Sequence, residues 1–396
     1  MKSQTEKNYM TVTADYLIIG GGIIGSSIAY HLSQSGNHHV VLCEKTKPPG
    51  RGSTFMSGGL VRMHHTSTHQ AKLAWSSYSY FRNWKGIIGG DCGFVETGFY
   101  QLVGEPFRSS MKQNLTMLKN IGIPTEEISS ADFLKNQPFC SLKGVGMIAY
   151  EPLGGYADPA QTTISFLQRA THNGLEILEG VQALSLKLKK NRIVGIHSNM
   201  GDIEAGEVIL CNNFGAYSLI DSIGIQLPLH TKHIGICFFG CDDEVGKNMG
   251  TILDDTMGTY YRRTKDGKLL VGITKHPHVD PTTLPPIHLD DLKKAAHLLK
   301  DRIPQINDSI AFYGGRSSFD SYTPDKHAVI GRVENMLGLY VATGFSGGGF
   351  KIAPAVGSLV ADELMSGQEQ EELNAFRYHR FRKNRLNKPA YPYENM

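Results

Sequence analysis

The chain of 396 residues lacks long hydrophobic runs and a strong net charge. No apolar run reaches the ~18 residues that a membrane-spanning helix needs, so we expect no transmembrane segment. Residues 1–13 are polar and mixed in charge, without the apolar stretch of a secretory signal peptide. The net charge of +3 gives no reason to expect a nucleic-acid partner.

Cysteine is also scarce. The six cysteines include no C-x-x-C pair, and Cys43 and Cys211 lie in apolar runs where we expect buried thiols. This usage fits a reducing, cytoplasmic location. His64, His65 and His69 form a small cluster, but their spacing lacks the companion ligands of a zinc motif, so we predict no metal site.

Glycine, in contrast, is abundant, at 44 of the 396 residues. This share is above the typical ~7% and predicts many close backbone approaches rather than disorder. The length allows a large core and predicts two domains, interleaved or in series.

Gly20, Gly22 and Gly25 follow an apolar run of strand length and precede a helical pattern, at the spacing G-x-G-x-x-G. A second apolar run then ends at Glu44. This is the βαβ dinucleotide-binding fingerprint, in which the glycines permit a tight turn, a close approach to a pyrophosphate and close helix–strand packing. The helix N-terminus is expected to face the phosphates. Glu44 is expected to accept the ribose hydroxyls, which disfavours NADP but leaves FAD and NAD open.

Three later segments have the composition of a cofactor site. The loop from Ser53 to Arg62 is rich in glycine and hydroxyl residues, which suits a segment passing beneath a flat cofactor. An apolar run opens into the turn 212–216, a junction typical of doubly wound sheets. The glycine turn from Gly344 to Lys351 opens a helix, whose N–H groups and dipole suit developing negative charge.

In this order the motifs resemble the D-amino-acid oxidase/sarcosine oxidase superfamily of FAD-dependent oxidoreductases. The likeness is carried by Gly20–Glu44, the Gly52–Arg62 loop and the C-terminal series Thr323-Pro324-Asp325 to Lys351. It is greatest to sarcosine oxidase β-subunits, glycine oxidases and proline dehydrogenase subunits.

The resemblance implies an α/β fold. A doubly wound, glutathione-reductase-like FAD-binding domain would be interleaved with an α+β substrate domain on a mostly antiparallel sheet. The implied boundaries are residues 14–90, 156–226 and 323–370 for the FAD-binding domain, 91–155 and 227–322 for the substrate domain, and 371–396 for a basic tail.

The motifs and the resemblance together give the expected FAD-binding residues. These are Gly20, Gly22, Ile23, Ile24, Gly25, Glu44, Lys45, Ser53, Thr54, Ser57, Gly58, Gly59, Val181, Gly215, Gly344, Gly347, Gly348, Gly349, Phe350 and Lys351.

The resemblance also implies the substrate-binding residues. Arg62 matches the arginine that holds the substrate carboxylate, for which a guanidinium fork is well suited. Lys351 matches a second carboxylate ligand. Tyr261 is expected as a further ligand or lid hydroxyl, with a structural strand tyrosine as the other interpretation. Arg316 lies near a carboxylate arginine of glycine oxidases, although its spacing differs.

Two departures from the family pattern bear on the cofactor and its reoxidation. Phe55-Met56 and Asp320 stand where relatives have a flavin-linking histidine or cysteine, so we expect FAD to be non-covalent. The oxygen-activating lysine of monomeric sarcosine oxidases is replaced by Leu269 or Leu270, which leaves O2 and an electron-acceptor partner both open.

We therefore expect the protein to oxidise the C–N bond of a small amino acid or N-alkyl amino acid, of sarcosine, glycine, proline or D-amino-acid type. Hydride would pass to flavin N5, and the product would be an imine. One alternative is an FAD-dependent 2-hydroxy-acid dehydrogenase, which needs a base that no histidine clearly supplies. Another is a non-catalytic or electron-relaying FAD subunit of a larger homo- or hetero-oligomer. The basic segment from Phe376 to Lys388 is predicted to be a solvated arm rather than a docking patch.

Overall fold

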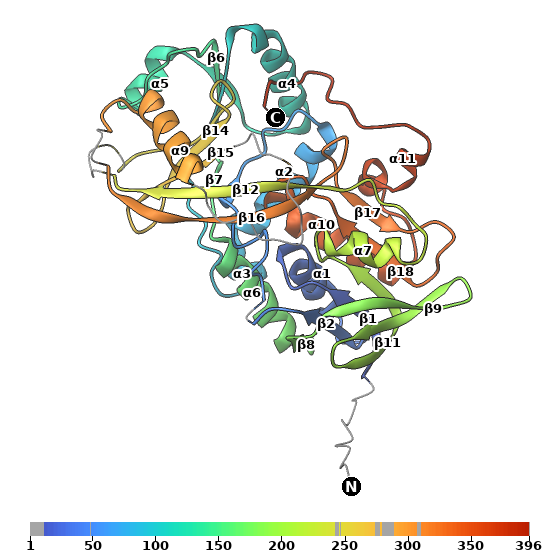
Figure 1. The fold of residues 1–396 in the computed structure, drawn as a ribbon. Helices are drawn as coiled ribbons and strands as arrows, with labels where there is room; N and C mark the ends of the chain where they lie inside the picture. Colours follow the sequence, from blue (N-terminus) through green and yellow to red (C-terminus); the bar gives the residue numbers. More distant parts are fainter. Residues whose placement is uncertain are drawn as a thin grey trace.

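The computed structural model describes residues 12–47, 49–241, 245, 247–273, 278, 289–306 and 310–395. Two large sheets, with helices packed on them, make up this part of the chain (Figure 1). Long apolar helices are lacking here: none of the described helices has the length and apolarity needed to cross a bilayer.

The first sheet is mainly parallel and lies around β1, in the strand order β17-β18-β11-β1-β2-β8. β10 pairs antiparallel with β11, β9 with β10, and β17 with β18. The strands are β1 (Val12–Ile19), β2 (Val40–Glu44), β8 (Glu176–Glu179), β9 (Ala183–Lys189), β10 (Arg192–Ser198), β11 (Gly201–Leu210), β17 (Val329–Arg332) and β18 (Leu339–Thr343).

Both faces of this sheet are covered, which explains the nearly continuous apolar runs of β1 and β2. Ile18 and Leu42 pack beneath the helices on one face, whereas Leu17 and Val41, one residue earlier in each strand, belong to the core on the other face. The first face carries α1 (Ile23–Ser33), α2 (Thr68–Arg82), α6 (Pro159–His172) and α10 (Gly349–Ser366); the second carries α7 (Gly215–Asp221) and the β9–β10 hairpin.

The second sheet is antiparallel except for the parallel pair β4–β13, in the strand order β16-β12-β15-β14-β13-β4-β6-β5. Its core packs against α5 (Ser130–Asn136) and α9 (Leu289–Arg302). The strands are β4 (Phe99–Val103), β5 (Glu126–Ile128), β6 (Met147–Glu151), β12 (His230–Phe239), β13 (Thr251–Asp254), β14 (Thr259–Arg263), β15 (Leu269–Ile273) and β16 (Phe312–Tyr322).

Smaller elements join the two sheets. They are β3 (Leu60–Val61), paired with β7 (Gly155–Tyr156), and α3 (Trp84–Ile87), η1 (Glu105–Phe107), α4 (Arg108–Ile121), η2 (Glu371–Phe376) and α11 (His379–Arg382). The chain alternates between the sheets, which agrees with the predicted fold class. The residue boundaries of the two domains stay a prediction.

The basic terminal segment, predicted to be a solvated terminal helix or arm, is solvated only in part: Arg382, Lys383, Arg385 and Lys388 are exposed, whereas two arginines are not. Arg377 donates to both oxygens of Glu363, at 2.8 and 2.6 Å, and Arg380 donates to both oxygens of Asp325, at 2.8 and 3.0 Å. Both arginines are buried. Their charges are therefore used within the fold, because a buried guanidinium requires a partner carboxylate.

Candidate functional site

A cavity of about 940 Å³ extends from the carboxyl ends of the parallel strands to one face of the second sheet. Ile19, Cys43 and Thr343, at the ends of β1, β2 and β18, line one part, while Ile234 and Tyr260 of the second sheet line another. Ligands of doubly wound sheets bind outside the carboxyl ends of the strands, so this is where the fold places a binding site.

The end of the cavity lined by Gly20, Gly22 and Glu44 is here called the nucleotide end. Close packing explains why its fingerprint positions are glycines. Gly20 has φ +106°, in the region that favours glycine, and a Cβ there would lie 2.8 Å from the carbonyl oxygen of Cys211. A Cβ on Gly25 would lie 2.0 Å from the carbonyl oxygen of Gly20, so α1 packs against β1 only without a side chain at this position. Gly25 does not line the cavity; its role is the helix–strand contact expected from the motif.

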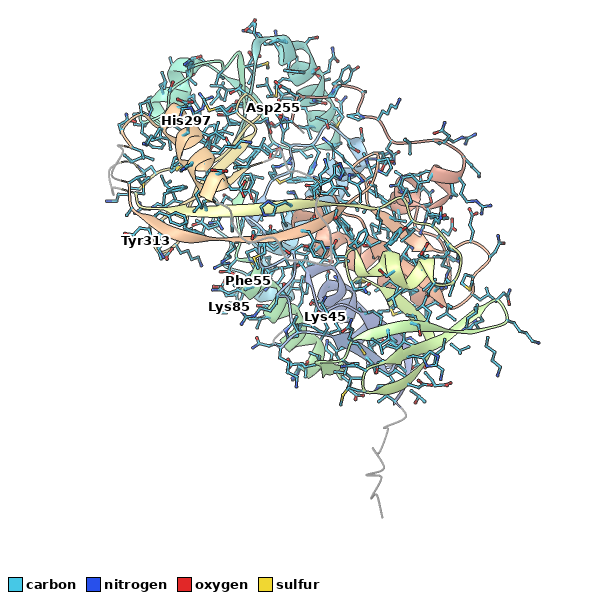
Figure 2. All side chains as sticks on the ribbon, in the orientation of Figure 1. Lys45, Phe55, Lys85, Asp255, His297 and Tyr313 are labelled. Carbon is cyan, nitrogen blue, oxygen red and sulfur yellow. The ribbon has the colours of Figure 1, made fainter. Side chains whose placement is uncertain are left out.

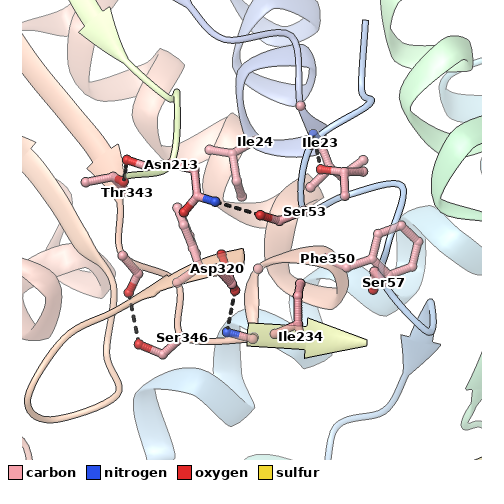
Figure 3. A pocket seen from close by; sticks show the side chains of 18 of the residues that line it. Ile23, Ile24, Ser53, Ser57, Asn213, Ile234, Asp320, Thr343, Ser346 and Phe350 are labelled. Carbon is pink, nitrogen blue, oxygen red and sulfur yellow. Dashed lines mark hydrogen bonds between the residues drawn. The ribbon is translucent and has the colours of Figure 1, made fainter. Parts of the chain in front are cut away.

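Glu44 lines the same end and orders the turn. Its Oε2 accepts from the N–H of Gly21 at 2.8 Å, and its Oε1 accepts from the N–H and the hydroxyl of Thr46, both at 2.9 Å. The carboxylate is thereby fixed against the glycine turn. The first N–H of α1, on Ile23, donates to Thr54 Oγ1 at 3.1 Å (Figure 3) and so is already used.

Apart from Gly25, every residue expected to bind the cofactor lines this cavity. The backbone N–H of Val181 donates to the Glu44 carbonyl at 3.1 Å, so Val181 can contribute only its apolar side chain and carbonyl. Lys45 borders the nucleotide end and lies on the opposite side of the β12–β16 strands from Asp255 in the view of Figure 2.

Asn213 was missed by sequence reasoning, although it connects three distant segments at the cavity. Its Nδ2 donates to Ser53 Oγ at 2.6 Å, its Oδ1 accepts from the N–H of Ser321 at 2.9 Å, and its carbonyl accepts from Thr343 Oγ1 at 2.7 Å (Figure 3). Its φ is +55°. Asparagine tolerates this conformation, so an asparagine pair directly after a strand was the available signal.

Asp320 lies beside the C-terminal glycine turn. Its Oδ2 accepts from the N–H of Gly347 at 2.9 Å, and its Oδ1 accepts from the N–H of Ser321 at 3.0 Å (Figure 3). Burial raises the pKa of Asp320 to about 6, against the opposing effect of these N–H donors. The N–H of Gly347, which we expected to face a cofactor, is therefore held by a carboxylate.

Arg62 and Lys351 meet at the other end of the cavity, and both are buried. Burial lowers the pKa of Arg62 to about 10, and burial together with Arg62 holds the pKa of Lys351 well below its usual range. Arg62 Nη1 has no hydrogen-bond partner among the described residues. Beneath them, burial raises the pKa of Glu151 to about 7, and its Oε2 accepts from the N–H of Met63 at 3.0 Å. The unpaired Nη1 of Arg62, beside the buried amine of Lys351, makes this end of the cavity a candidate anion site.

The three clustered histidines have separate environments. His65 lines the cavity, and its Nε2 has no partner in the described chain. Burial and the nearby cations, Arg62 first, hold the pKa of His65 well below its usual range, so the ring is neutral. His64 is buried beside Tyr393, 2.9 Å from His64 Nε2 to the phenol oxygen, and His69 is exposed on α2.

Tyr261 does not lie in the cavity, which corrects its expected role as a ligand or lid. Its hydroxyl donates to the carbonyl oxygen of Leu298 at 3.2 Å, inside the core beneath α9. Tyr260, the preceding residue of β14, lines the cavity instead. Neighbouring residues of a strand point to opposite faces, so an error of one position reverses the assignment.

Arg316 also lies outside the residues that line the cavity. Its guanidinium stacks on Phe55, 4.2 Å from guanidinium carbon to ring centre, and donates to the Phe55 carbonyl at 3.2 Å. It therefore supports the Ser53–Arg62 loop from behind. Arg262 has a similar role, because its Nε donates to the carbonyl oxygen of Gly58 at 2.6 Å.

The fold and this cavity define a dinucleotide-dependent oxidoreductase. Glycine backbone borders the cavity at both ends, and the volume lies in the range of cofactor sites. The chain matches the model of the family described as FAD dependent oxidoreductase (DAO) over residues 15–363. It belongs to this family, which confirms the resemblance seen in the sequence and identifies FAD as the cofactor.

Curated relatives are similar over most of this chain. The chain is 26% identical to 4-methylaminobutanoate oxidase (formaldehyde-forming) of Paenarthrobacter nicotinovorans, covering 92% of this chain and 45% of that protein. It is 25% identical to the mitochondrial pyruvate dehydrogenase phosphatase regulatory subunit of Mus musculus, covering 91% and 42%. The chain thus spans less than half the length of these two relatives.

Solved structures share the whole fold. L-proline dehydrogenase from P. horikoshii superimposes with a TM-score of 0.88 at 25% identity, covering 96% of this chain and all of that chain. Glycine oxidase from Geobacillus kaustophilus superimposes with a TM-score of 0.82 at 20% identity, covering 93% and 99%.

Proposed function

We propose that this protein oxidises the C–N bond of a small amino acid or N-alkyl amino acid whose carboxylate is held by Arg62 and Lys351. The observation that carries the proposal is the unpartnered, buried Nη1 of Arg62, next to a buried lysine in the same cavity. The Nη1 N–H of Arg62 is left unsatisfied, and a substrate carboxylate would accept from it and stabilise the protonated form of Lys351. The printed names of relatives, an oxidase of a methylamino acid and a proline dehydrogenase, support this substrate class.

Bound FAD supplies the hydride acceptor for this oxidation. The protein's part is to orient the substrate. Arg62 and Lys351 would fix its carboxylate, and Tyr260, held over Gly58, would limit where its amine can lie. The positive charge of Arg62 would favour an unprotonated amine nearby, and His65, which is neutral, adds nothing to this effect.

We further propose that FAD is bound without a covalent link. The Phe55 ring contacts the guanidinium groups of Arg51 and Arg316, with 5.4 and 4.2 Å from guanidinium carbons to its ring centre, and offers no nucleophile. Cys43 and Cys211 line the cavity, but burial raises the pKa of both thiols, that of Cys43 to about 12. A protonated thiol is a poor nucleophile. Acid precipitation that leaves the flavin in the supernatant is the expected result; a yellow pellet would contradict it.

The electron acceptor is proposed to be a partner or quinone rather than O2 alone. Leu269 and Leu270 are buried strand residues outside the cavity lining, and Lys268 pairs with Asp266 at 2.6 Å. Lys275 lies outside the described residues. Reoxidation of the reduced enzyme should be faster with an artificial acceptor than with air, and the reverse order would contradict this.

One specific observation supports a second candidate function, the oxidation of a 2-hydroxy acid. Oxidation of a 2-hydroxy acid needs a base for the hydroxyl proton. The free Nε2 of His65 lines the cavity and would be the acceptor for this proton, which sequence reasoning did not find. Its lowered pKa makes the imidazole a weak base, which favours the first proposal over this one.

Anaerobic reduction of the bound flavin separates these functions. Purified holoenzyme is mixed with sarcosine, glycine, L-proline, D-proline, 4-methylaminobutanoate or lactate, and loss of the visible flavin band is followed. Reduction by amino acids supports the first proposal, and reduction by lactate supports the second. If no donor reduces the flavin until a partner protein is added, both are wrong for the isolated chain, and a subunit role remains.

A further inference from the structure

The last described residues of the chain return to the cavity. After α11, residues 387–395, here called the terminal strap, cross from the first sheet toward α4, as the red trace in Figure 1 shows. Pro389 and Asn395 of this strap line the same cavity as Arg62 and Lys351. The strap therefore contributes to the wall of the cavity that holds the proposed carboxylate site.

The strap is fixed at both ends by buried carboxylates. The N–H of Asn387 donates to Asp325 Oδ2 at 3.1 Å. At the other end, the N–H groups of Glu394 and Asn395 donate to the two oxygens of Asp255, at 2.9 and 2.8 Å. Asp255 is buried and follows β13 directly. Backbone N–H groups paired with a buried carboxylate hold a segment in one position, because breaking them leaves the charge unsatisfied.

Between its ends the strap packs into the protein. Tyr393 is buried in a small core, and its phenol oxygen lies 2.9 Å from His64 Nε2. The residue before His64 is Met63, whose N–H donates at 3.0 Å to Glu151, the carboxylate beneath Arg62. Asn114 of α4 donates to the Tyr391 carbonyl at 2.9 Å. The strap is thus in contact with the residues that position Arg62.

Asn395 is the polar side chain that the strap presents at the cavity. Its Nδ2 donates to the carbonyl oxygen of Asp255, which fixes the amide plane. Its Oδ1 is buried and has no hydrogen-bond partner among the described residues. A buried amide oxygen without a donor is unfavourable, and a ligand N–H or O–H would satisfy it.

We propose that the terminal strap is a wall of the substrate pocket and that Asn395 is a specificity-determining residue. It would limit the size of the group carried on the substrate's nitrogen or α-carbon and would accept a hydrogen bond from it. The preferred substrates are then small amino acids with an N–H, rather than bulky or fully apolar ones. This inference rests on the proposed function, since it assumes a carboxylate at Arg62.

The test compares Asn395→Ala, Asp255→Asn and the control Tyr391→Ser in the holoenzyme. Tyr391 belongs to the same strap, but its side chain is exposed and does not line the cavity. We measure kcat/KM for sarcosine, N-ethylglycine and N-propylglycine. Asn395→Ala should raise the ratio of kcat/KM for the larger substrates to kcat/KM for sarcosine by about tenfold. This is the effect of about one methylene in a pocket. Asp255→Asn should shift this ratio in the same direction by less, and Tyr391→Ser should leave it unchanged.

A binding measurement keeps this test separate from the proposed function. Dissociation constants of acetate, propionate and butyrate are read from the perturbation of the flavin spectrum, without turnover. If no amino acid reduces the flavin, yet Asn395→Ala still shifts the series toward the longer acids, the proposed function fails and the strap proposal stands. Equal changes for every substrate and every acid, or a shift in Tyr391→Ser as large as in Asn395→Ala, would overturn the strap proposal.

Discussion

The two ends of the cavity are built in different ways. The nucleotide end is formed largely by one continuous unit, from Gly20 to Glu44, in which the turn, the helix and the acidic residue are neighbours in sequence. The carboxylate end brings Arg62 together with Lys351 and Asn395, which lie hundreds of residues later in the sequence. The first end depends on local backbone geometry, whereas the second depends on how both sheets and the terminal strap pack.

The largest effect is expected at the carboxylate end. Arg62→Ala removes the free guanidinium and leaves a bound carboxylate beside Lys351 alone. Losing one partner of a buried charge pair costs about 2–4 kcal/mol, or roughly 30- to 1,000-fold in kcat/KM for a carboxylate substrate. Arg62→Lys should recover only part, because an ammonium lacks the fork. FAD affinity should stay unchanged in both; normal oxidation by Arg62→Ala would show that the carboxylate lies elsewhere.

At the nucleotide end, we expect a substitution to destabilise the protein through a steric clash in the packed backbone. Gly25→Ala would place a Cβ 2.0 Å from the Gly20 carbonyl oxygen and should destabilise the protein by about 1–3 kcal/mol, with weaker FAD binding. Gly104→Ala is the matched control, because its φ is -73°, a Cβ there meets Pro106 and Gly144 only at the ordinary contact distances of 3.6 and 3.7 Å, and the residue does not line the cavity. Chemical denaturation with and without FAD measures both. Equal stability of the two variants would refute the packing explanation.

A pH effect should distinguish the carboxylate end from the nucleotide end. Burial and Arg62 lower the pKa of Lys351, and a bound carboxylate would raise it again. Binding then takes up a proton, so affinity is full below the lowered pKa and falls as pH rises above it, by up to tenfold per unit. Titrations with propionate, which has no amine, measure this slope.

Two variants show which groups cause the affinity for propionate to depend on pH. Lys351→Met should flatten the slope, whereas Glu151→Gln should remove the part due to Glu151, whose pKa of about 7 makes it negative in the same range. FAD affinity should not follow this pH dependence. An unchanged slope in Lys351→Met would rule out lysine as the titrating group.

The smallest effect is expected from Glu44→Gln. The amide keeps one acceptor but cannot accept from both the Gly21 N–H and the Thr46 groups. Losing one hydrogen bond should weaken FAD binding by about 0.5–1.5 kcal/mol, at most roughly tenfold. Titration of the apoprotein with FAD measures it. A change in carboxylate binding of the same size would show that the two ends are not independent.

Sequence reasoning placed residues at the cavity where the motif is local, and their binding of FAD stays a prediction. The fingerprint predicted Gly20, Gly22 and Glu44 at the cavity, and the glycine turn predicted Gly347 to Lys351 there. It was less accurate where a residue's direction depends on strand register or on distant partners. Tyr261 was one position from the cavity residue Tyr260, and Arg316, expected near a carboxylate-binding position, stacks on Phe55 outside the cavity lining.

The amino-acid sequence by itself determined the class of cofactor site, because a tight turn, a helix N-terminus and a close helix–strand contact each require glycine at a fixed spacing. Only the tertiary structure decided which side chains line the proposed substrate end of the cavity. Arginines of the basic terminal segment are paired inside the fold, and the strap beyond them reaches the cavity. Charge along a sequence does not reveal a buried carboxylate that is distant in sequence, since such pairing arises only when the packed elements bring the two together.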